Sequence, residues 1–241
     1  MLVKTKRFLR SFTPYQIGYL TVVLLITAVF AIFFPELMLE ETSSKFVTLC
    51  SVVAVLANPV CELLISKQSK LNFLVDALFI EIPEFILCIA MGWYTIAITT
   101  MVFWIPIDIV SYIQWSRHPD RQKEELTEVR RLSWKQAILV VGGIILFSLV
   151  VGYFISRLPG ATDSYIDALA SACGMANGIL LLLRHSEQWY AWLMTLILYA
   201  IIYVSSGAYI MLVTVAAMLV NTCYGYYKWY KYTQAEKRRA R

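Results

Sequence analysis

Acidic residues and a proline interrupt an apolar run between Asp76 and Phe85, which reads DALFIEIPEF. At about 100° per residue, Asp76, Glu81 and Glu84 fall on one side of a helix, within about 140°. Pro83 removes a backbone hydrogen bond and predicts a kink. An acid inside hydrocarbon costs several kcal/mol unless it faces water, a partner or a ligand. The run therefore predicts a polar cavity.

Two neighbouring apolar segments carry polar groups at comparable depth. One contains Asp108, two residues after Pro106, and the other contains Asn58-Pro59 followed by Glu62. An alternative is that some acids lie near helix ends and extend to the interface. Glu62 and Asp76 fit that alternative, and we expect the other acids to line the cavity.

Aromatic residues form a narrow stripe on a later segment, WYAWLMTLILYAIIYV, within about 80° of one another on a helix. The stripe comprises Trp189, Trp192, Leu196, Tyr199 and Tyr203. It indicates either helix packing with an interfacial belt or a stacking wall for a flat heterocycle. Such faces attract cations by up to ~2 kcal/mol when desolvated. In the last segment Asn221 is a candidate ligand, whereas we expect interface anchors at Tyr226, Tyr227, Trp229 and Tyr230.

The composition indicates a membrane protein: 59% of the residues are hydrophobic and 15% are charged. The net charge of +5 does not indicate nucleic-acid binding, because the basic residues lie at segment ends and in both tails. The five cysteines lie in apolar runs without metal-ligand spacing, so we interpret them as packing residues. The sequence has no GxSxG, Walker A or HExxH motif. We expect no enzyme activity, cofactor or metal.

Eight segments are long and apolar enough to cross a bilayer. They are 17–35, 46–66, 71–91, 93–115, 136–156, 163–183, 187–204 and 207–229. Basic loops alternate with neutral or acidic ones, which places both termini in the cytoplasm. The loop 116–135, with its alternating charges, is expected to be a solvated helix.

Segments 2–4 and 6–8 resemble each other and predict an internal repeat. Ala57-Asn58 matches Ala176-Asn177 at an offset of 119 residues, and aromatic motifs match at 115 and 114. A single linker helix between the units makes the repeat parallel, and such repeats typically enclose a transport path. The predicted organisation is a tail with an extra helix, a first three-helix unit, a loop with a linker helix, a second unit and a basic tail: 1–45, 46–115, 116–162, 163–230 and 231–241.

The second unit also carries landmarks of a known family. They are Asp167, Arg184, Trp189-x-x-Trp192, Gly207-x-Tyr209 and Asn221-x-x-Tyr224-Gly225 before Trp229. This pattern resembles the PnuC family of bacterial vitamin transporters, whose best-known members import nicotinamide riboside. The resemblance covers roughly 46–230. It implies a SWEET-like 3+1+3 all-α fold behind one extra N-terminal helix, a homotrimer in the bacterial inner membrane, and facilitated diffusion with trapping by phosphorylation.

This chain departs from the family pattern at several amide positions. Leu196 stands where the family has an Asn, four residues after the second Trp. Asp108 and Thr222 stand where the family has an Asn seven residues before a closing Trp, although Asn221 is adjacent. The matching polar position of the third segment falls near Ile80-Glu81. Acids therefore partly replace the amides that would bind a riboside.

These features together predict an importer for a flat, positively charged heterocycle. The substrate-binding candidates are Trp189, Trp192, Tyr199, Glu81, Glu84, Asp108, Asn58, Asn177 and Asn221. Nicotinamide riboside, a pyridinium, comes first through the resemblance, and thiamine, a thiazolium, suits the same groups. A neutral deoxynucleoside suits the aromatic residues but not the acids.

Two other hypotheses remain. One is a proton-coupled importer with Glu81, Glu84 or Asp108 as the relay. The other is a membrane enzyme acting on lipid, which lacks the His or Cys for the usual chemistry. The expected partners are a small-molecule substrate and the lipid bilayer, without nucleic acid.

Overall fold

The computed structural model describes residues 12–33, 45–90, 97, 99–120, 127–157, 164–205 and 211–239. Every regular element in these ranges is a helix. The elements are α2 (Pro14–Phe33), α3 (Lys45–Ser66), α4 (Leu71–Asp76), η2 (Ala77–Glu81), α5 (Ile82–Ala90), η3 (Thr100–Trp104), α7 (Ile105–Ser116), α8 (Trp134–Ile155), α9 (Ser164–Leu182), α10 (Gln188–Ser205) and α11 (Met211–Arg239).

These helices coincide with the predicted apolar segments. The described helix ends lie within about four residues of the predicted ones, with two exceptions. The predicted start at 93 lies outside the described residues, and α11 continues ten residues beyond position 229. Among the described residues, α3, α8, α9 and α10 are each long and apolar enough to cross a membrane. Pro14–Val29 is a shorter apolar stretch. The crossing of all eight segments stays a prediction.

Two π-helical turns, η2 and η3, precede two of the prolines of the first unit, Pro83 and Pro106. Pro83 and Pro106 have no backbone N–H, so each leaves a carbonyl of the preceding turn without its α-helical partner. The residue before each proline instead donates five residues back, Ile82 to the Ala77 carbonyl and Ile105 to the Thr100 carbonyl. The kink predicted at Pro83 therefore takes the form of a π-turn, a feature frequent at functional sites.

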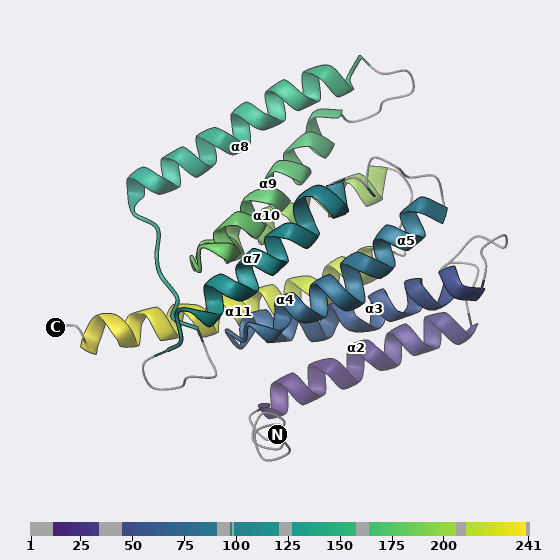
Figure 1. Ribbon diagram of the computed structural model, residues 1–241, viewed down its shortest axis with the longest axis horizontal. Coiled ribbons are helices and arrows are strands. Elements are labelled where there is room, and N and C mark those ends of the chain that lie inside the picture. The colour runs from purple at the N-terminus through teal and green to yellow at the C-terminus, as the bar shows by residue number, and fades with distance from the viewer. Residues whose placement is uncertain are drawn as a thin grey trace.

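The helices run roughly side by side, with α2 and α8 on opposite edges (Figure 1). In the first unit α3 contacts α4 and α5, and α4 contacts α7. In the second unit α9 contacts α10, and α10 contacts α11. The units meet where α3 contacts α11 and where α7 contacts α9. Helix α8 lies against α9. Only 11% of its most apolar 18-residue stretch is buried, so a broad apolar face of α8 points away from the bundle.

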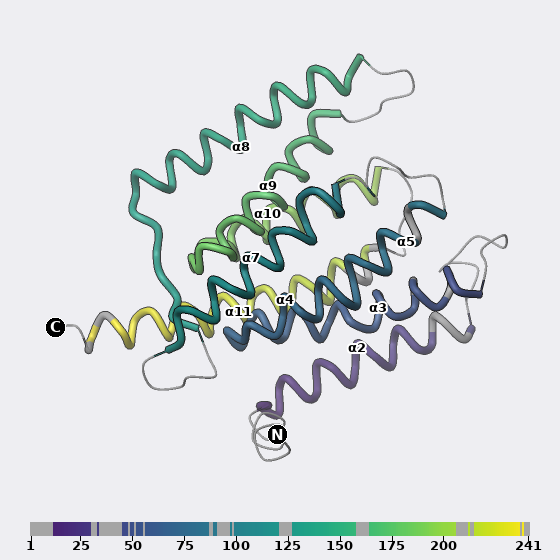
Figure 2. Tube along the Cα trace, viewed as in Figure 1, coloured from purple at the N-terminus to yellow at the C-terminus, as the bar shows by residue number. Residues whose placement is uncertain are grey.

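The chain between α7 and α8 is not the predicted helix where the structure describes it. Residues 127–133 run in an extended course to the start of α8 (Figure 2). The Arg130 N–H donates to the Arg184 carbonyl, and the Ser186 N–H donates to the Arg130 carbonyl. The backbone of this segment is thus hydrogen-bonded to the turn between α9 and α10. The stretch 121–126 lies outside the described residues.

The ends of α3 and α9 repeat one motif. Gln68 and Arg184, 116 residues apart, both have positive φ, 59° and 63°. Ser69 donates to Leu64, and the equivalent His185 donates to Leu180. The matching offset at this end is therefore 116 residues. This offset differs from the 119 residues predicted from Asn58 and Asn177, and the repeat itself stays a prediction.

Candidate functional site

Four aromatic side chains form a buried layer at one end of the bundle. Phe73, Trp115, Trp189 and Trp229 are each at most 2% exposed. Phe73 meets Trp115 edge to face with ring centroids 5.0 Å apart, and Trp189 meets Trp229 likewise at 5.6 Å. The Trp115 and Trp229 centroids are 6.0 Å apart. We refer to these four residues as the aromatic layer.

The two closing tryptophans fasten the units to each other. The Trp115 indole N–H donates to the Leu181 carbonyl at 2.8 Å, and the Trp229 indole N–H donates to the Ile65 carbonyl at 3.1 Å. Each bond joins the last helix of one unit to the first helix of the other. The interpretation of Trp229 as an interface anchor is wrong, because its side chain is fully buried.

Trp189 belongs to this layer and does not form an open wall. Its ring lies over Gly225, where a Cβ atom would stand 2.3 Å from the nearest ring carbon. The contact explains why the sequence has a glycine at this place in α11. Trp189 is therefore a helix-packing residue. It does not belong to an interfacial belt, because its side chain is buried.

A polar group lies one helical turn beyond the aromatic layer. Asn221 Nδ2 donates to both the backbone oxygen and Oε2 of Glu62, at 3.1 Å each. The indole N–H of Trp192 faces the same carboxylate without a hydrogen bond of normal geometry. Asp76 is partly buried beside Cys61. Glu62 is only 6% exposed, so the expectation that it extends to the interface is wrong.

Glu81 and Asp108 extend this acidic group along α7 and η2. Both are buried, and Glu81 Oε2 and Asp108 Oδ2 have no hydrogen-bond partner among the described residues. Asp108 interacts electrostatically with both Asp76 and Glu81. A π-turn closes between residues five apart, so η2 turns Asp76 and Glu81 toward the same side, where an α-helix would separate them by about 140°.

The described residues offer these acids no cationic counterpart. In this part of the chain, no Lys, Arg or His nitrogen lies within 4 Å of the carboxylates of Glu62, Asp76, Glu81 or Asp108. Negative charge without a partner at such depth is costly. The group therefore favours a positively charged occupant or bound protons.

The remaining predicted residues lie in different surroundings. Asn177 Nδ2 donates to the backbone oxygen and Oε1 of Gln188, at 3.1 and 2.6 Å, so it clamps α9 to α10. Tyr199 stacks on Tyr203 and packs against the α9 core. Asn58 and Glu84 are partly buried on α3 and α5. The structure thus gathers Glu81, Asp108, Asn221 and Trp192, and leaves Asn177 and Tyr199 in packing contacts.

Glu62 is the residue that sequence reasoning undervalued. Its position near the end of an apolar segment suggested exposure. Its partner Asn221 lies 159 residues away, so no local pattern connects them. The signal present in the sequence is Pro59 one turn before Glu62, which marks an irregular, polar part of the segment.

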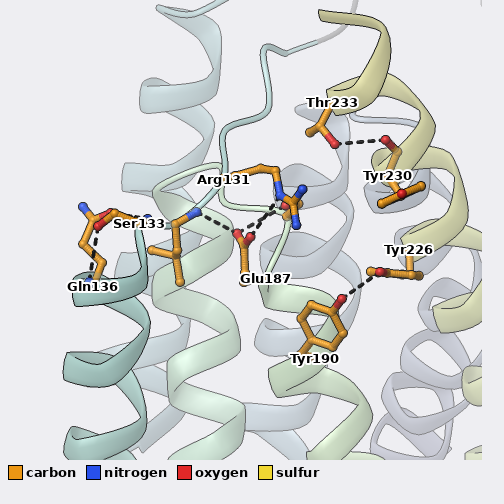
Figure 3. Close-up of polar contacts among 10 residues, drawn as sticks. Arg131, Ser133, Gln136, Glu187, Tyr190, Tyr226, Tyr230 and Thr233 are labelled. Carbon is orange, nitrogen blue, oxygen red and sulfur yellow. Dashed lines mark hydrogen bonds and ion pairs between the residues drawn. The ribbon is translucent and has the colours of Figure 1, made fainter. Parts of the chain in front are cut away.

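Further polar contacts lie around the loop between α9 and α10 (Figure 3). Glu187 accepts from the Leu132 backbone N–H and pairs with Arg131 at 3.5 Å, and Tyr190 pairs with Tyr226 at 2.7 Å. Burial lowers the pKa of His185, and nearby Arg130 and Arg184 act in the same direction. Glu187 acts in the opposite direction without reversing the shift, so the neutral form of His185 is favoured.

Metal binding finds no support among the described residues. They include no group of three or more His, Cys, Asp or Glu side chains that could hold a metal ion.

Comparison with known proteins gives a consistent family. The model of the family described as nicotinamide mononucleotide transporter matches residues 48–231. The nicotinamide riboside transporter PnuC of Neisseria mucosa is 21% identical over 230 residues, 92% of this chain and 82% of that protein. The PnuC of Haemophilus influenzae is 22% identical over 186 residues, 75% of this chain and 79% of that protein.

A solved structure shows the same fold. The crystal structure of the vitamin B3 transporter PnuC covers 92% of each chain with a TM-score of 0.70 and 20% sequence identity. An all-α membrane fold follows from this likeness together with the apolar helices. Because the family model spans well over half of its length, the chain belongs to the nicotinamide mononucleotide transporter family, which includes the PnuC proteins.

Proposed function

We propose that this protein is a transporter that imports a flat cationic vitamin, with nicotinamide riboside as the first candidate. The observation that carries the proposal is the group of four acids within the bundle, which have no cationic partner among the described residues and one of which faces Trp192. A positive charge 4 Å from a carboxylate is stabilised by about 4 kcal/mol at an effective dielectric constant of about 20. The indole face adds an attraction of up to ~2 kcal/mol.

Charge also separates the related substrates. Nicotinamide riboside presents a pyridinium, whereas the mononucleotide adds a phosphate whose negative charge would meet the acids unfavourably. A neutral deoxynucleoside gains nothing from the carboxylates. Thiamine, with its thiazolium, remains the second candidate, because the fully buried Leu196 replaces the amide that the family resemblance implies for a riboside.

The proposed architecture has eight membrane-spanning segments and a parallel 3+1+3 repeat. The contacts support it, because the first helix of each unit packs on the last helix of the other. The two indole bonds, Trp115 to Leu181 and Trp229 to Ile65, repeat at offsets of 114 and 116 residues. The loops after α3, α7 and α9, which carry eight of the nine basic residues in the loops between helices, end at one side of the bundle (Figure 1). That side is proposed to face the cytoplasm of the inner membrane, with both termini.

The proposed transport mode is facilitated diffusion, with the substrate trapped inside by phosphorylation. Proton coupling is the competing mode, and the oxygens of Glu81 and Asp108 that lack a partner among the described residues favour it. Uptake into proteoliposomes with and without an imposed pH gradient separates the two. Uptake that depends on the gradient, and that loses this dependence in Glu81→Gln or Asp108→Asn, would establish coupling.

The proposed function is tested by a binding screen on detergent-purified protein. Nicotinamide riboside, nicotinamide mononucleotide, thiamine, riboflavin and deoxynucleosides are titrated by calorimetry. We expect nicotinamide riboside to bind most tightly. Tight binding of thiamine without binding of nicotinamide riboside would reassign the substrate, and binding of neither cation would refute the proposed function.

A further inference from the structure

We infer that Glu62 is the residue that makes the site select for a positive charge: its carboxylate contacts the cationic ring while Asn221 holds it from behind. The inference rests on the proposed function, because it names the specificity-determining residue of that same site. Neither the family pattern in the sequence nor the polar spacing of the segments points to this residue.

Asn221 fixes the orientation of Glu62. One amide group binds both the backbone oxygen and Oε2 of the same residue at 3.1 Å, so it restricts the side chain to one direction. The second oxygen, Oε1, accepts no hydrogen bond of normal geometry from a described residue. A carboxylate that is held at one oxygen and open at the other is arranged to receive a ligand.

The neighbours of Glu62 also have unmet polar atoms. Asn221 is fully buried, and in the described part of the chain neither its Oδ1 nor the indole nitrogen of Trp192 has a partner. Buried polar groups are normally satisfied. If the cluster served only to join helices, its donors and acceptors would be paired with each other. These atoms therefore point to a ligand with both a positive charge and hydrogen-bonding groups.

The second unit shows that the fold does not need this acid. The position 116 residues after Glu62 is Gly178, and the position 114 residues before Asn221 is Ile107. These two equivalents also meet: a Cβ at Gly178 would lie 3.6 Å from Ile107 and 3.1 Å from Trp104. In the contact between α9 and α7, a glycine and apolar side chains thus occupy the places that Glu62 and Asn221 occupy between α3 and α11. The polar pair is an addition to one side only, and it orients a charged ligand in one direction.

Other groups nearby define what Glu62 can contact. From α4 the carboxyl of Asp76 interacts electrostatically with Glu62, from α2 the hydroxyl of Tyr19 does so, and from α10 Trp192 faces it. None of these groups is cationic. A positively charged ring is therefore the complement that the site lacks, and Trp192 supplies the face on which it stacks.

The test compares each cation with its neutral isostere. Nicotinamide riboside is paired with 1,4-dihydronicotinamide riboside, and thiamine is paired with 3-deazathiamine, in which a thiophene replaces the thiazolium. We expect the wild-type protein to prefer the cation of the pair that it binds. In Glu62→Gln, which keeps the shape and the bond from Asn221, we expect about 100-fold weaker binding of the cation and less than about 3-fold change for the neutral isostere.

Two variants serve as controls. The double variant Glu62→Gly/Asn221→Ile copies the Gly178 and Ile107 pair of the second unit, so it has a packing solution already present in this fold. It is expected to fold, by thermal unfolding and size exclusion, and to lose the cation preference. Glu128→Gln removes a carboxylate from the loop and is expected to leave both affinities unchanged.

The outcomes are distinguishable. If the wild-type protein binds neither cation, the proposed function itself fails. If it binds a cation and its isostere equally, or if Glu62→Gln weakens both ligands to the same extent, Glu62 does not read the charge and the inference is overturned. The inference is also overturned if Asp108→Asn abolishes the preference while Glu62→Gln retains it.

Discussion

In the half of the bundle built from α3, α4, α5 and α7, acids and π-turns lie where the half built from α9, α10 and α11 has tryptophan, glycine and regular α-helix. The two halves nevertheless end alike. Each has a helix end with a positive-φ residue, and each has a closing tryptophan whose indole binds the other half. Asp76 and Trp192 occupy equivalent places, 116 residues apart.

This comparison separates scaffold from site. The contacts that recur at offsets of 114 to 116 residues are the aromatic layer and the helix-end turns, which hold the units together. The positions that differ lie one turn further in, where one half presents carboxylates and the other presents Trp192. If the proposed repeat holds, its two halves present different groups to the site, which suits a ligand whose own two faces differ, such as a flat cation.

Apart from the Glu62 variants, the largest expected effect comes from removing the aromatic face of the asymmetric pair. Trp192→Ala should weaken substrate binding about 30-fold, because a desolvated indole contact of about 2 kcal/mol is lost. Calorimetry on the purified variant measures it, with thermal unfolding as the control for folding. Unchanged affinity would show that α10 does not contribute to the site. Asp76 and Trp192 would then correspond in position but not in ligand binding.

A second test exchanges packing between the halves. Gly225 accommodates the Trp189 ring, whereas the equivalent place in α7 is Ser111 and the equivalent of Trp189 is Phe73. Gly225→Ser should destabilise the protein by about 1–3 kcal/mol through overpacking. Adding Trp189→Phe, which copies the first half, should restore most of the lost thermal stability. Additive losses in the double-mutant cycle would contradict the equivalence.

The two indole hydrogen bonds provide a more symmetric comparison. Trp115→Phe and Trp229→Phe each remove one donor and leave a carbonyl of the other unit unpaired. We expect losses of about 1 kcal/mol each, visible as similar decreases in melting temperature. Clearly unequal losses of stability would show that one of the two indole hydrogen bonds contributes more than the other to holding the units together.

The smallest effect is expected at an interaction that the first half lacks. Arg131 pairs with Glu187 at 3.5 Å and is partly exposed, whereas the equivalent of Glu187 is Leu71. Arg131→Ala should cost no more than about 0.5 kcal/mol, and less at high salt. Glu187→Ala should cost slightly more, because it also removes the acceptor of the Leu132 backbone N–H. Thermal unfolding at two salt concentrations measures both.

The helices themselves were predictable because hydropathy and charged flanks determine where an apolar segment begins and ends. The prediction of a helix in the loop 116–135 was wrong in its described part, because alternating charges are typical of a solvated helix yet residues 127–133 bind the backbone near Arg184. The 100° spacing predicted Asp76 and Glu81 on one side of the helix but about 140° apart, and the π-turn η2 brings them closer together than an α-helix would.

The site was predictable in part. Acidic residues are unusual in an apolar run, so Glu81 and Asp108 were identified from their residue type alone. Glu62 and Trp229 were misjudged, because both lie near segment ends, where exposure is the usual outcome. Their burial depends on partners in the other unit, Asn221 and the Ile65 carbonyl, more than 150 residues away.

The sequence by itself determined the membrane class, the helical segments, the family and the surplus of acids, because these depend on composition, local runs and motif spacing. Only the tertiary structure decided which acid is held by an amide, that Trp189 fills a packing layer while Trp192 faces a carboxylate, and that the acids lack counter-ions among the described residues. These are contacts between helices distant in the chain, and their geometry arises from packing that no local pattern specifies.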